Sequence, residues 1–144
     1  MKSAAGFTLV ELMVVVAVLA IVITLAIPVS NNARINANEG SAVGSMRTFV
    51  SSNETYRTRF GSYASAIQDL ADAGIIDERL ASAIADPGKA GYVFTYNTGP
   101  DTYTVLGTPF ESGRSGIRHF YVDPSGVIRF ADSTRATSVS TPID

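Results

Sequence analysis

Residues 7–29 read FTLVELMVVVAVLAIVITLAIPV, an apolar stretch with a single charged side chain, Glu11. As an α-helix this stretch would be roughly 35 Å long, enough to cross a hydrocarbon core of ~30 Å. Its β-branched residues lower helix propensity in water, but a segment in lipid must satisfy its own backbone hydrogen bonds. The stretch therefore predicts a helix that spans a membrane.

Glu11 distinguishes this stretch from an ordinary membrane anchor. An ionised carboxylate in hydrocarbon costs about 3 kcal/mol even on lenient insertion scales. The next basic residue along the chain is Arg34, and Lys2 is too far before Glu11 for a helical pair. If the chain were cut after Gly6, the new α-amine of Phe7 would lie about one helical turn from Glu11 and could pair with it, in the same chain or in a neighbour. The alternative reading of the residues places Glu11 near the lipid headgroups.

The start of the chain carries a recognisable motif. Residues 5–12 read AGFTLVEL, and this segment resembles the processing site of type IV pilins and type II secretion pseudopilins, in which the usual pattern is G-F-T-L-x-E-L. Pro28 also matches a proline that is common in that family. The resemblance implies cleavage between Gly6 and Phe7 and N-methylation of the new Phe7 amine by a prepilin peptidase/methyltransferase.

The same resemblance implies how the subunits assemble. Glu11 would pair with the Phe7 amine of the next subunit, while the apolar helices form the core of a helical homo-oligomeric filament. Pro28 lacks an N–H group, so we expect a kink in the helix there and a role in assembly.

The resemblance gives a leading function and two alternatives. The leading one is a prepilin, a structural subunit that is single-pass in the inner membrane and is polymerised by an inner-membrane assembly platform into a pilus on the cell surface. The second is a pseudopilin of a type II secretion system, which forms a short periplasmic filament. The third is an uncleaved, signal-anchored binding or sensing protein.

From residue 30 onward the apolar pattern becomes that of an amphipathic helix that continues to residue 60. Its apolar positions recur at helical spacing: Ala42, Val43, Met46, Phe49, Val50, Tyr56 and Phe60. Gly61 is a plausible C-cap. The sequence therefore predicts one helix over residues 7–60, with an apolar stripe on its second half facing a globular head.

The remaining chain predicts short helices followed by strands. Ser65 with Gln68 resembles a capping box, and Asp77 is suited to cap a second short helix. Alternating patterns predict strands at 92–96, 102–106, 117–122 and 127–130. The expected fold class is α+β: the pilin fold, with a long N-terminal helix and a small four-stranded antiparallel sheet.

These patterns divide the chain into consecutive segments. They are a leader peptide at 1–6, a transmembrane or filament-core helix segment at 7–29, an amphipathic helix half at 30–61, a connecting region at 62–90, the sheet at 91–131 and a C-terminal tail at 132–144. The sequence has no cysteine, so the end of the chain must be held by sheet pairing and packing. The Ser/Thr-rich tail is expected to pack weakly or to extend.

Composition argues against several other functions. The formal net charge is −2, and no basic face supports nucleic-acid binding as a default. The single histidine, His119, lies in a strand pattern without a partner, so we expect a sheet residue rather than a catalytic base. Acidic residues at 69, 72, 77 and 78 do not have the spacing of an EF-hand loop and are expected to be surface carboxylates. We therefore expect no enzyme, no metal and no cofactor.

Overall fold

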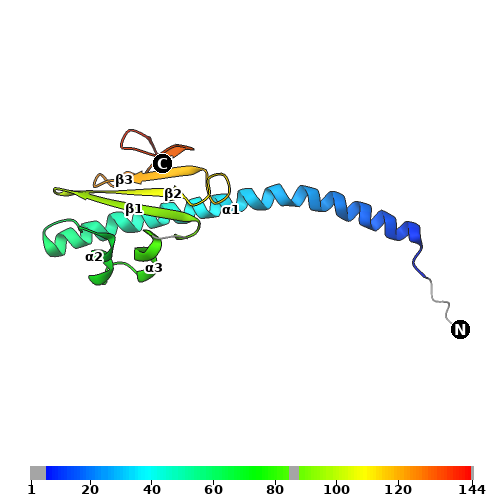
Figure 1. Ribbon diagram of the computed structural model, residues 1–144, viewed down its shortest axis with the longest axis horizontal. Helices are drawn as coiled ribbons and strands as arrows, with labels where there is room; N and C mark the ends of the chain where they lie inside the picture. Colours follow the sequence, from blue (N-terminus) through cyan, green and yellow to red (C-terminus); the bar gives the residue numbers. More distant parts are fainter. Residues whose placement is uncertain (1–5, 85–87, 144) are drawn as a thin grey trace. The chain divides into compact units, whose positions relative to one another are not determined.

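The computed structural model describes residues 6–84 and 88–143, and among these the side chains of residues 25–30 are outside the description. The chain divides into two compact units, residues 1–33 and residues 34–144. The helix α1 (Leu9–Phe60) contributes to both units (Figure 1). Each unit is described separately below.

The predicted long helix is confirmed. It begins two residues later than expected, at Leu9, and ends at Phe60. Gly61 follows with φ of +80°, a conformation that glycine adopts without strain, and its N–H donates to the carbonyl of Arg57 at 2.8 Å. The sequence pattern located this end because a glycine directly follows the last apolar position.

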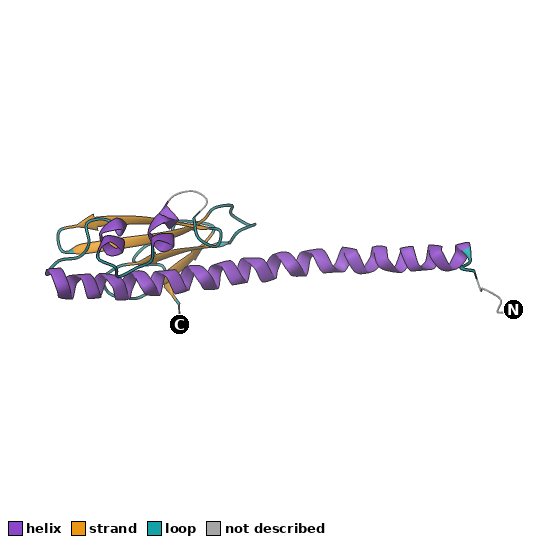
Figure 2. Ribbon diagram, turned by 90° about the horizontal axis from the view of Figure 1, so that it is seen from below, coloured by secondary structure: helices purple, strands orange, loops and turns teal. Residues whose placement is uncertain are grey.

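The second unit contains an antiparallel sheet in the order β1-β2-β3-β4-β5 (Figure 2). The strands are β1 (Tyr92–Gly99), β2 (Thr102–Pro109), β3 (Arg118–Val122), β4 (Arg129–Asp132) and β5 (Thr141–Pro142). β1 and β2 form a tight hairpin in which Gly99 pairs with Thr102. The antiparallel α+β architecture is therefore the expected pilin fold.

The prediction of four strands was wrong, because the tail supplies a fifth. β5 pairs with β4, with Thr141 opposite Phe130, and the Ile143 N–H donates to the carbonyl of Ile128 at 2.8 Å. β4 itself lies two residues later than predicted. A two-residue strand is too short to show an alternating pattern, so its position depends on the neighbouring strand.

The core of this unit lies between the sheet and the helices. Buried side chains of α1 include Ala42, Met46 and Phe49, and the sheet contributes Phe94 and Phe120. Two short helices after α1 also contribute to this core: α2 (Ile67–Asp72) and α3 (Glu78–Ala81). The 3-10 helix η1 (Ser82–Ile84) directly follows α3. The apolar stripe predicted for α1 is thus largely buried.

Phe60 is an exception in that stripe, because it is 57% exposed. It lies in the last turn of α1 and packs on Tyr56, with the two ring centroids 4.4 Å apart, rather than in the core. The spacing of the stripe was correct, but the helix extends beyond the part of the core that could bury its last residue.

The caps of the short helices were predicted in part. Asp77 caps α3, accepting from the N–H of Leu80 at 2.7 Å, as expected. The predicted capping box of Ser65 and Gln68 is wrong by one position. The carboxylate of Asp69 instead accepts from the N–H groups of Ser65 and Ala66, each at 2.9 Å. An aspartate accepts backbone N–H groups better than a glutamine does, since its carboxylate is charged.

Two buried polar residues of α1 were not predicted. Glu39 accepts from the N–H groups of Ile117 and Arg118 at 2.9 and 3.1 Å, and from Arg118 Nε at 2.6 Å. Burial alone raises the pKa of Glu39, but these hydrogen bonds and the guanidinium outweigh it and hold the pKa below its usual value. Asn53 is fully buried and accepts from the Tyr96 hydroxyl at 2.6 Å. Both residues therefore fasten α1 to the sheet.

Candidate functional site

The first turn of α1 contains Glu11, the acidic residue that the sequence predicts to act in assembly. Thr8 and Glu11 form a reciprocal cap: Thr8 Oγ1 accepts from the Glu11 N–H at 3.2 Å, and Glu11 Oε2 accepts from the Thr8 N–H at 3.0 Å. The Thr8 hydroxyl also donates to Glu11 Oε2 at 2.7 Å. The carboxylate is thus held close to the helix N-terminus, where the helix dipole favours negative charge.

Sequence reasoning overlooked Thr8 as a partner of Glu11. The signal was present, because threonine followed three residues later by glutamate, before an apolar run, is the pattern of a capping box. Thr8 satisfies hydrogen bonds of the carboxylate but is neutral. The negative charge of Glu11 therefore has no compensating cation among the described residues of its own turn.

Gly6 and Phe7 lie directly before this cap and are both exposed. Phe7 is 83% exposed, and a side chain built on Gly6 would meet no other atom within 4 Å. The structure thus places the expected cleavage bond and Glu11 within six consecutive residues, with nothing described covering them. An exposed backbone next to a residue without a side chain is accessible to a peptidase.

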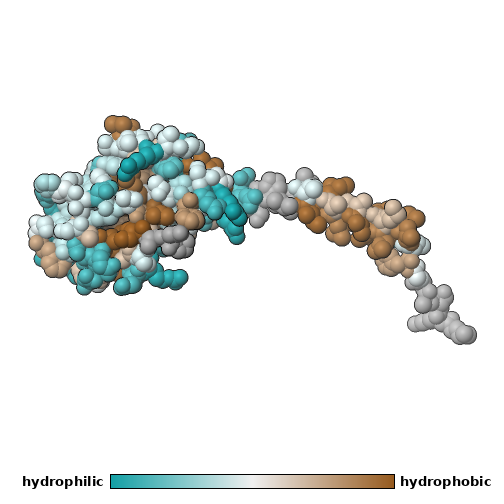
Figure 3. Space-filling view, viewed as in Figure 1, coloured by the Kyte–Doolittle hydropathy of each residue, from teal (hydrophilic) through white to brown (hydrophobic). Residues whose placement is uncertain are grey.

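The helix surface that follows this cap is apolar and uncovered within its unit. Every described side chain from residue 6 to residue 24 is exposed, and the surface is coloured as hydrophobic in Figure 3. The exposed apolar side chains include Leu9, Val10, Leu12, Val14 and Ile21. In the part of the chain that is described, no helix meets the requirements of length and hydropathy for spanning a membrane.

Pro28 lies within α1, so the helical backbone continues through it. Its side chain falls outside the described residues. The kink and the role in assembly that were expected at Pro28 therefore stay predictions.

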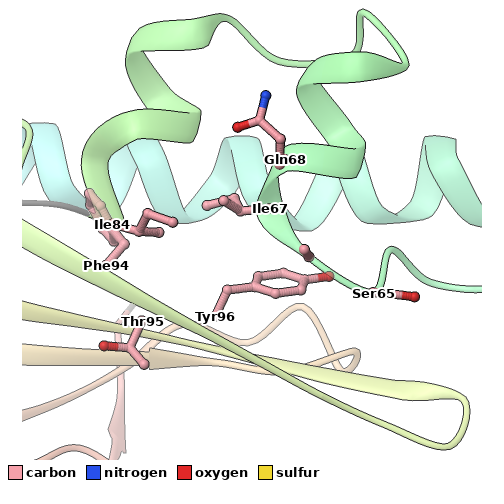
Figure 4. Close-up of a pocket in the computed structure, with 8 residues that line it drawn as sticks. Ser65, Ile67, Gln68, Ile84, Phe94, Thr95 and Tyr96 are labelled. Carbon is pink, nitrogen blue, oxygen red and sulfur yellow. The ribbon is translucent and has the colours of Figure 1, made fainter.

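The second unit contains a pocket of about 340 Å³ between α2 and the outer strand β1. Ile67 lies above Tyr96 and Ile84 lies beside Phe94 (Figure 4). The Tyr96 hydroxyl lies 2.6 Å from Asn53 Oδ1 and 3.1 Å from the carbonyl of Ala64. Burial raises the pKa of Tyr96, so the phenol stays protonated and the pocket offers packing surface rather than a base.

Three of the remaining candidate residues, all aspartates, have structural partners, whereas His119 Nδ1 is buried with no hydrogen-bond partner among the described residues. His119 lies in β3 as predicted, and burial lowers its pKa. Asp69 and Asp77 cap α2 and α3, and Asp72 accepts from Gln68 at 3.2 Å. Over residues 6–84 and 88–143, no three metal-binding side chains form a group. These carboxylates therefore stabilise short helices.

The fold and the first turn together define a class of protein. A long N-terminal helix with its second half packed on a small antiparallel sheet is the architecture of the pilin fold. Residues 1–27 match the family model described as the prokaryotic N-terminal methylation motif. This motif is the signature of type IV pilins and pseudopilins, and it supports a pilin-like or pseudopilin substrate of prepilin peptidase.

Proposed function

We propose that this chain is a prepilin that is cut between Gly6 and Phe7, methylated on the Phe7 nitrogen and polymerised into a type IV pilus. The observation that carries the proposal is the methylation motif over residues 1–27, which contains both the cleavage bond and Glu11. The same motif is found in pilins, which form pili, and in pseudopilins, which form the short filaments of type II secretion systems.

The state of Glu11 supports an ionic step in assembly. Its carboxylate already accepts hydrogen bonds from the N–H and hydroxyl groups of Thr8, but it has no cationic partner among the described residues of that turn. Cleavage after Gly6 would create an α-amine on Phe7, next to the N–H that the carboxylate already accepts. In the apolar interior of a filament a buried charge needs an opposite charge, so the Phe7 amine of the neighbouring subunit is the expected partner.

The exposed apolar surface of residues 7–24 supports two successive environments for this helix. Contiguous apolar surface of this kind marks a membrane or protein contact. We infer that lipid covers it in the single-pass precursor in the inner membrane, together with residues 25–29. Neighbouring copies of the same helix then cover it in the filament, after transfer by an inner-membrane assembly platform.

Mass spectrometry of the N-terminal peptide tests this proposal. Filaments sheared from the cell surface should yield an abundant peptide that begins with N-methylated Phe7. The same peptide confined to the membrane fraction would instead indicate the pseudopilin function, while a peptide beginning at Met1 would contradict the filament function altogether.

A further inference from the structure

A groove with an aromatic floor and an acidic rim lies where α1 ends beside α2. Its volume is about 260 Å³, and its lining residues are Tyr56, Phe60, Asp69, Asp72 and Ala73. The rings of Tyr56 and Phe60 pack together with their centroids 4.4 Å apart, and Phe60 remains largely exposed. Tyr56 is half-buried and packs against the core on its other side, so Phe60 supplies most of the exposed aromatic surface.

The chemistry of this groove selects a cation. Aromatic faces attract guanidinium and ammonium groups, and carboxylates at the rim can accept their hydrogen bonds. Asp69 Oδ2 is used in capping α2, and Asp72 Oδ1 accepts from Gln68. The other oxygen of each carboxylate accepts no hydrogen bond from the described residues. Each remains available to an incoming donor.

The second unit also presents a prominent cation, at its opposite end. Arg114 lies in the loop between β2 and β3, and its side chain is 83% exposed. This loop is fastened to α1 near Asn38, the side chain of which donates to the carbonyl of Ser115 at 2.8 Å. Asn38 and Phe60 both lie on α1, so a rise of 1.5 Å per residue separates them by roughly 33 Å. Arg114 therefore cannot reach the groove of its own molecule.

We propose that Arg114 of one copy binds in the Tyr56–Phe60 groove of the next copy, between Asp69 and Asp72. The inference rests on the proposed function, because it identifies a contact between subunits of the same filament. Arg114 now pairs with Glu111 at 3.1 Å, an exposed pair of a kind that is generally weak. Breaking this pair therefore costs little, and the groove offers Arg114 two carboxylates and an aromatic face in its place.

The arrangement of the two surfaces determines the type of assembly. The groove and Arg114 are different surfaces at opposite ends of the unit, so copies that repeat this contact in one direction are arranged head-to-tail. A head-to-tail contact that does not close into a ring produces an open filament. A two-fold dimer would use both grooves and both arginines in a closed pair, so cross-linked species larger than a dimer distinguish the open assembly from it.

Site-specific cross-linking tests the contact directly. The chain has no cysteine, so a variant with Ala73→Cys and Ser112→Cys carries only these two thiols and keeps Asp69, Asp72 and Arg114. A short bis-maleimide added to intact cells should produce a ladder of covalent dimers, trimers and larger species. The matched control combines Glu78→Cys with Ser112→Cys, since Glu78 is an exposed acid of α3 outside the groove. An equal ladder from the control, or no ladder from the first variant, would overturn the contact.

Charge exchange provides a second test that does not depend on thiols. Asp72→Arg places like charges in contact, and we expect about a tenfold loss of filament or more. Arg114→Asp should lose a similar amount, and the double variant should recover most of it. Asp72 is the last residue of α2, where a cation suits the helix dipole, so the substitution should leave the fold intact.

The outcomes separate this contact from the proposed function. Normal filaments from both single variants would overturn the contact while the methylated Phe7 start still supported a pilin. Absence of that start in the wild-type protein would overturn the function. If Arg114→Asp reduced membrane association of unassembled protein and Asp72→Arg had no effect, Arg114 would contact lipid headgroups, and the groove would lose its proposed partner.

Discussion

Glu11 has two separable roles at the scale of the residue. It caps α1 through Thr8, and we propose that its charge pairs with the Phe7 amine of a neighbour. The capping role needs only hydrogen-bond acceptors near the helix N-terminus. The pairing role needs a negative charge. Substitutions of Thr8 and of Glu11 can therefore distinguish the capping role from the pairing role.

We predict that Glu11→Ala and Glu11→Gln are still cleaved after Gly6 but form few filaments, because the amine loses its counter-charge in an apolar core. Immunoblots of precursor and processed chain, with the yield of sheared filaments, measure both steps. Thr8→Val is the control, since it removes a cap of about 1 kcal/mol but keeps the charge. If Glu11→Gln gave normal filaments, or Thr8→Val were as defective as Glu11→Ala, charge pairing would not explain the role of Glu11.

Glu39 should give the head an acid-sensitive component of stability. Its folded pKa is lowered from 4.5, so the unfolded state binds a proton first as pH falls. The stabilisation is fully present above about pH 4.5 and is lost as pH falls through the folded pKa. We predict that Glu39→Gln destabilises the head by about 2 kcal/mol at neutral pH. The difference from wild type should shrink as pH falls below about 4.5, as measured by urea unfolding at each pH. A difference that is constant with pH would contradict this account.

Glycine is required at position 116 because the side chain of Tyr92 lies against its backbone, not because of a turn. A methyl group added there would overlap the ring of Tyr92, the hydroxyl of which donates to the carbonyl of Arg118 at 2.8 Å. We predict that Gly116→Ala costs about 2 kcal/mol through overpacking. Gly113→Ala is the comparison. The added methyl group meets no neighbour there, but the φ of Gly113 is positive, so this variant tests backbone strain without overlap. Thermal unfolding of both variants would show which effect dominates, and an unchanged Gly116→Ala protein would exclude the overlap.

At the scale of the element, β5 holds the end of the chain. It pairs with β4, and Ile143 packs against the core. We predict that deletion of residues 141–144 lowers the free energy of unfolding by about 2 kcal/mol, since paired backbone and one apolar side chain are lost. The midpoint of urea unfolding measures the effect. Val139→Ala is the control, because Val139 is 90% exposed, and a deletion no more harmful than this control would show that β5 is dispensable.

At the scale of the whole molecule, the buried apolar side chains of the described residues lie within residues 34–144. The second unit holds the buried parts of α1, the short helices and the whole sheet. We predict that a fragment of residues 34–144 is folded and does not form filaments, because it lacks the exposed apolar surface of residues 7–24. Circular dichroism and sedimentation would test both properties. A fragment that unfolds without cooperativity would show that residues 1–33 contribute to folding.

Several features of this fold could be predicted from the sequence alone. Local patterns predicted the long helix, its end at Gly61 and the β1–β2 hairpin, because helical and strand periodicity depend on neighbours along the chain. The capping of α3 by Asp77 is local in the same way. The motif at the cleavage bond is a short continuous segment, so it too was readable from the sequence.

Other features required the tertiary structure. Glu39 is 78 residues from Ile117 in the chain, and nothing in the sequence around either residue indicates their pairing. β5 is a strand only because β4 lies beside it, and Phe60 is exposed only because the core ends before it. The sequence by itself determined the helix and its acidic first turn, since these depend on adjacent residues. The tertiary structure decided which polar groups are buried and what closes the sheet, because burial and strand pairing depend on residues distant in the chain.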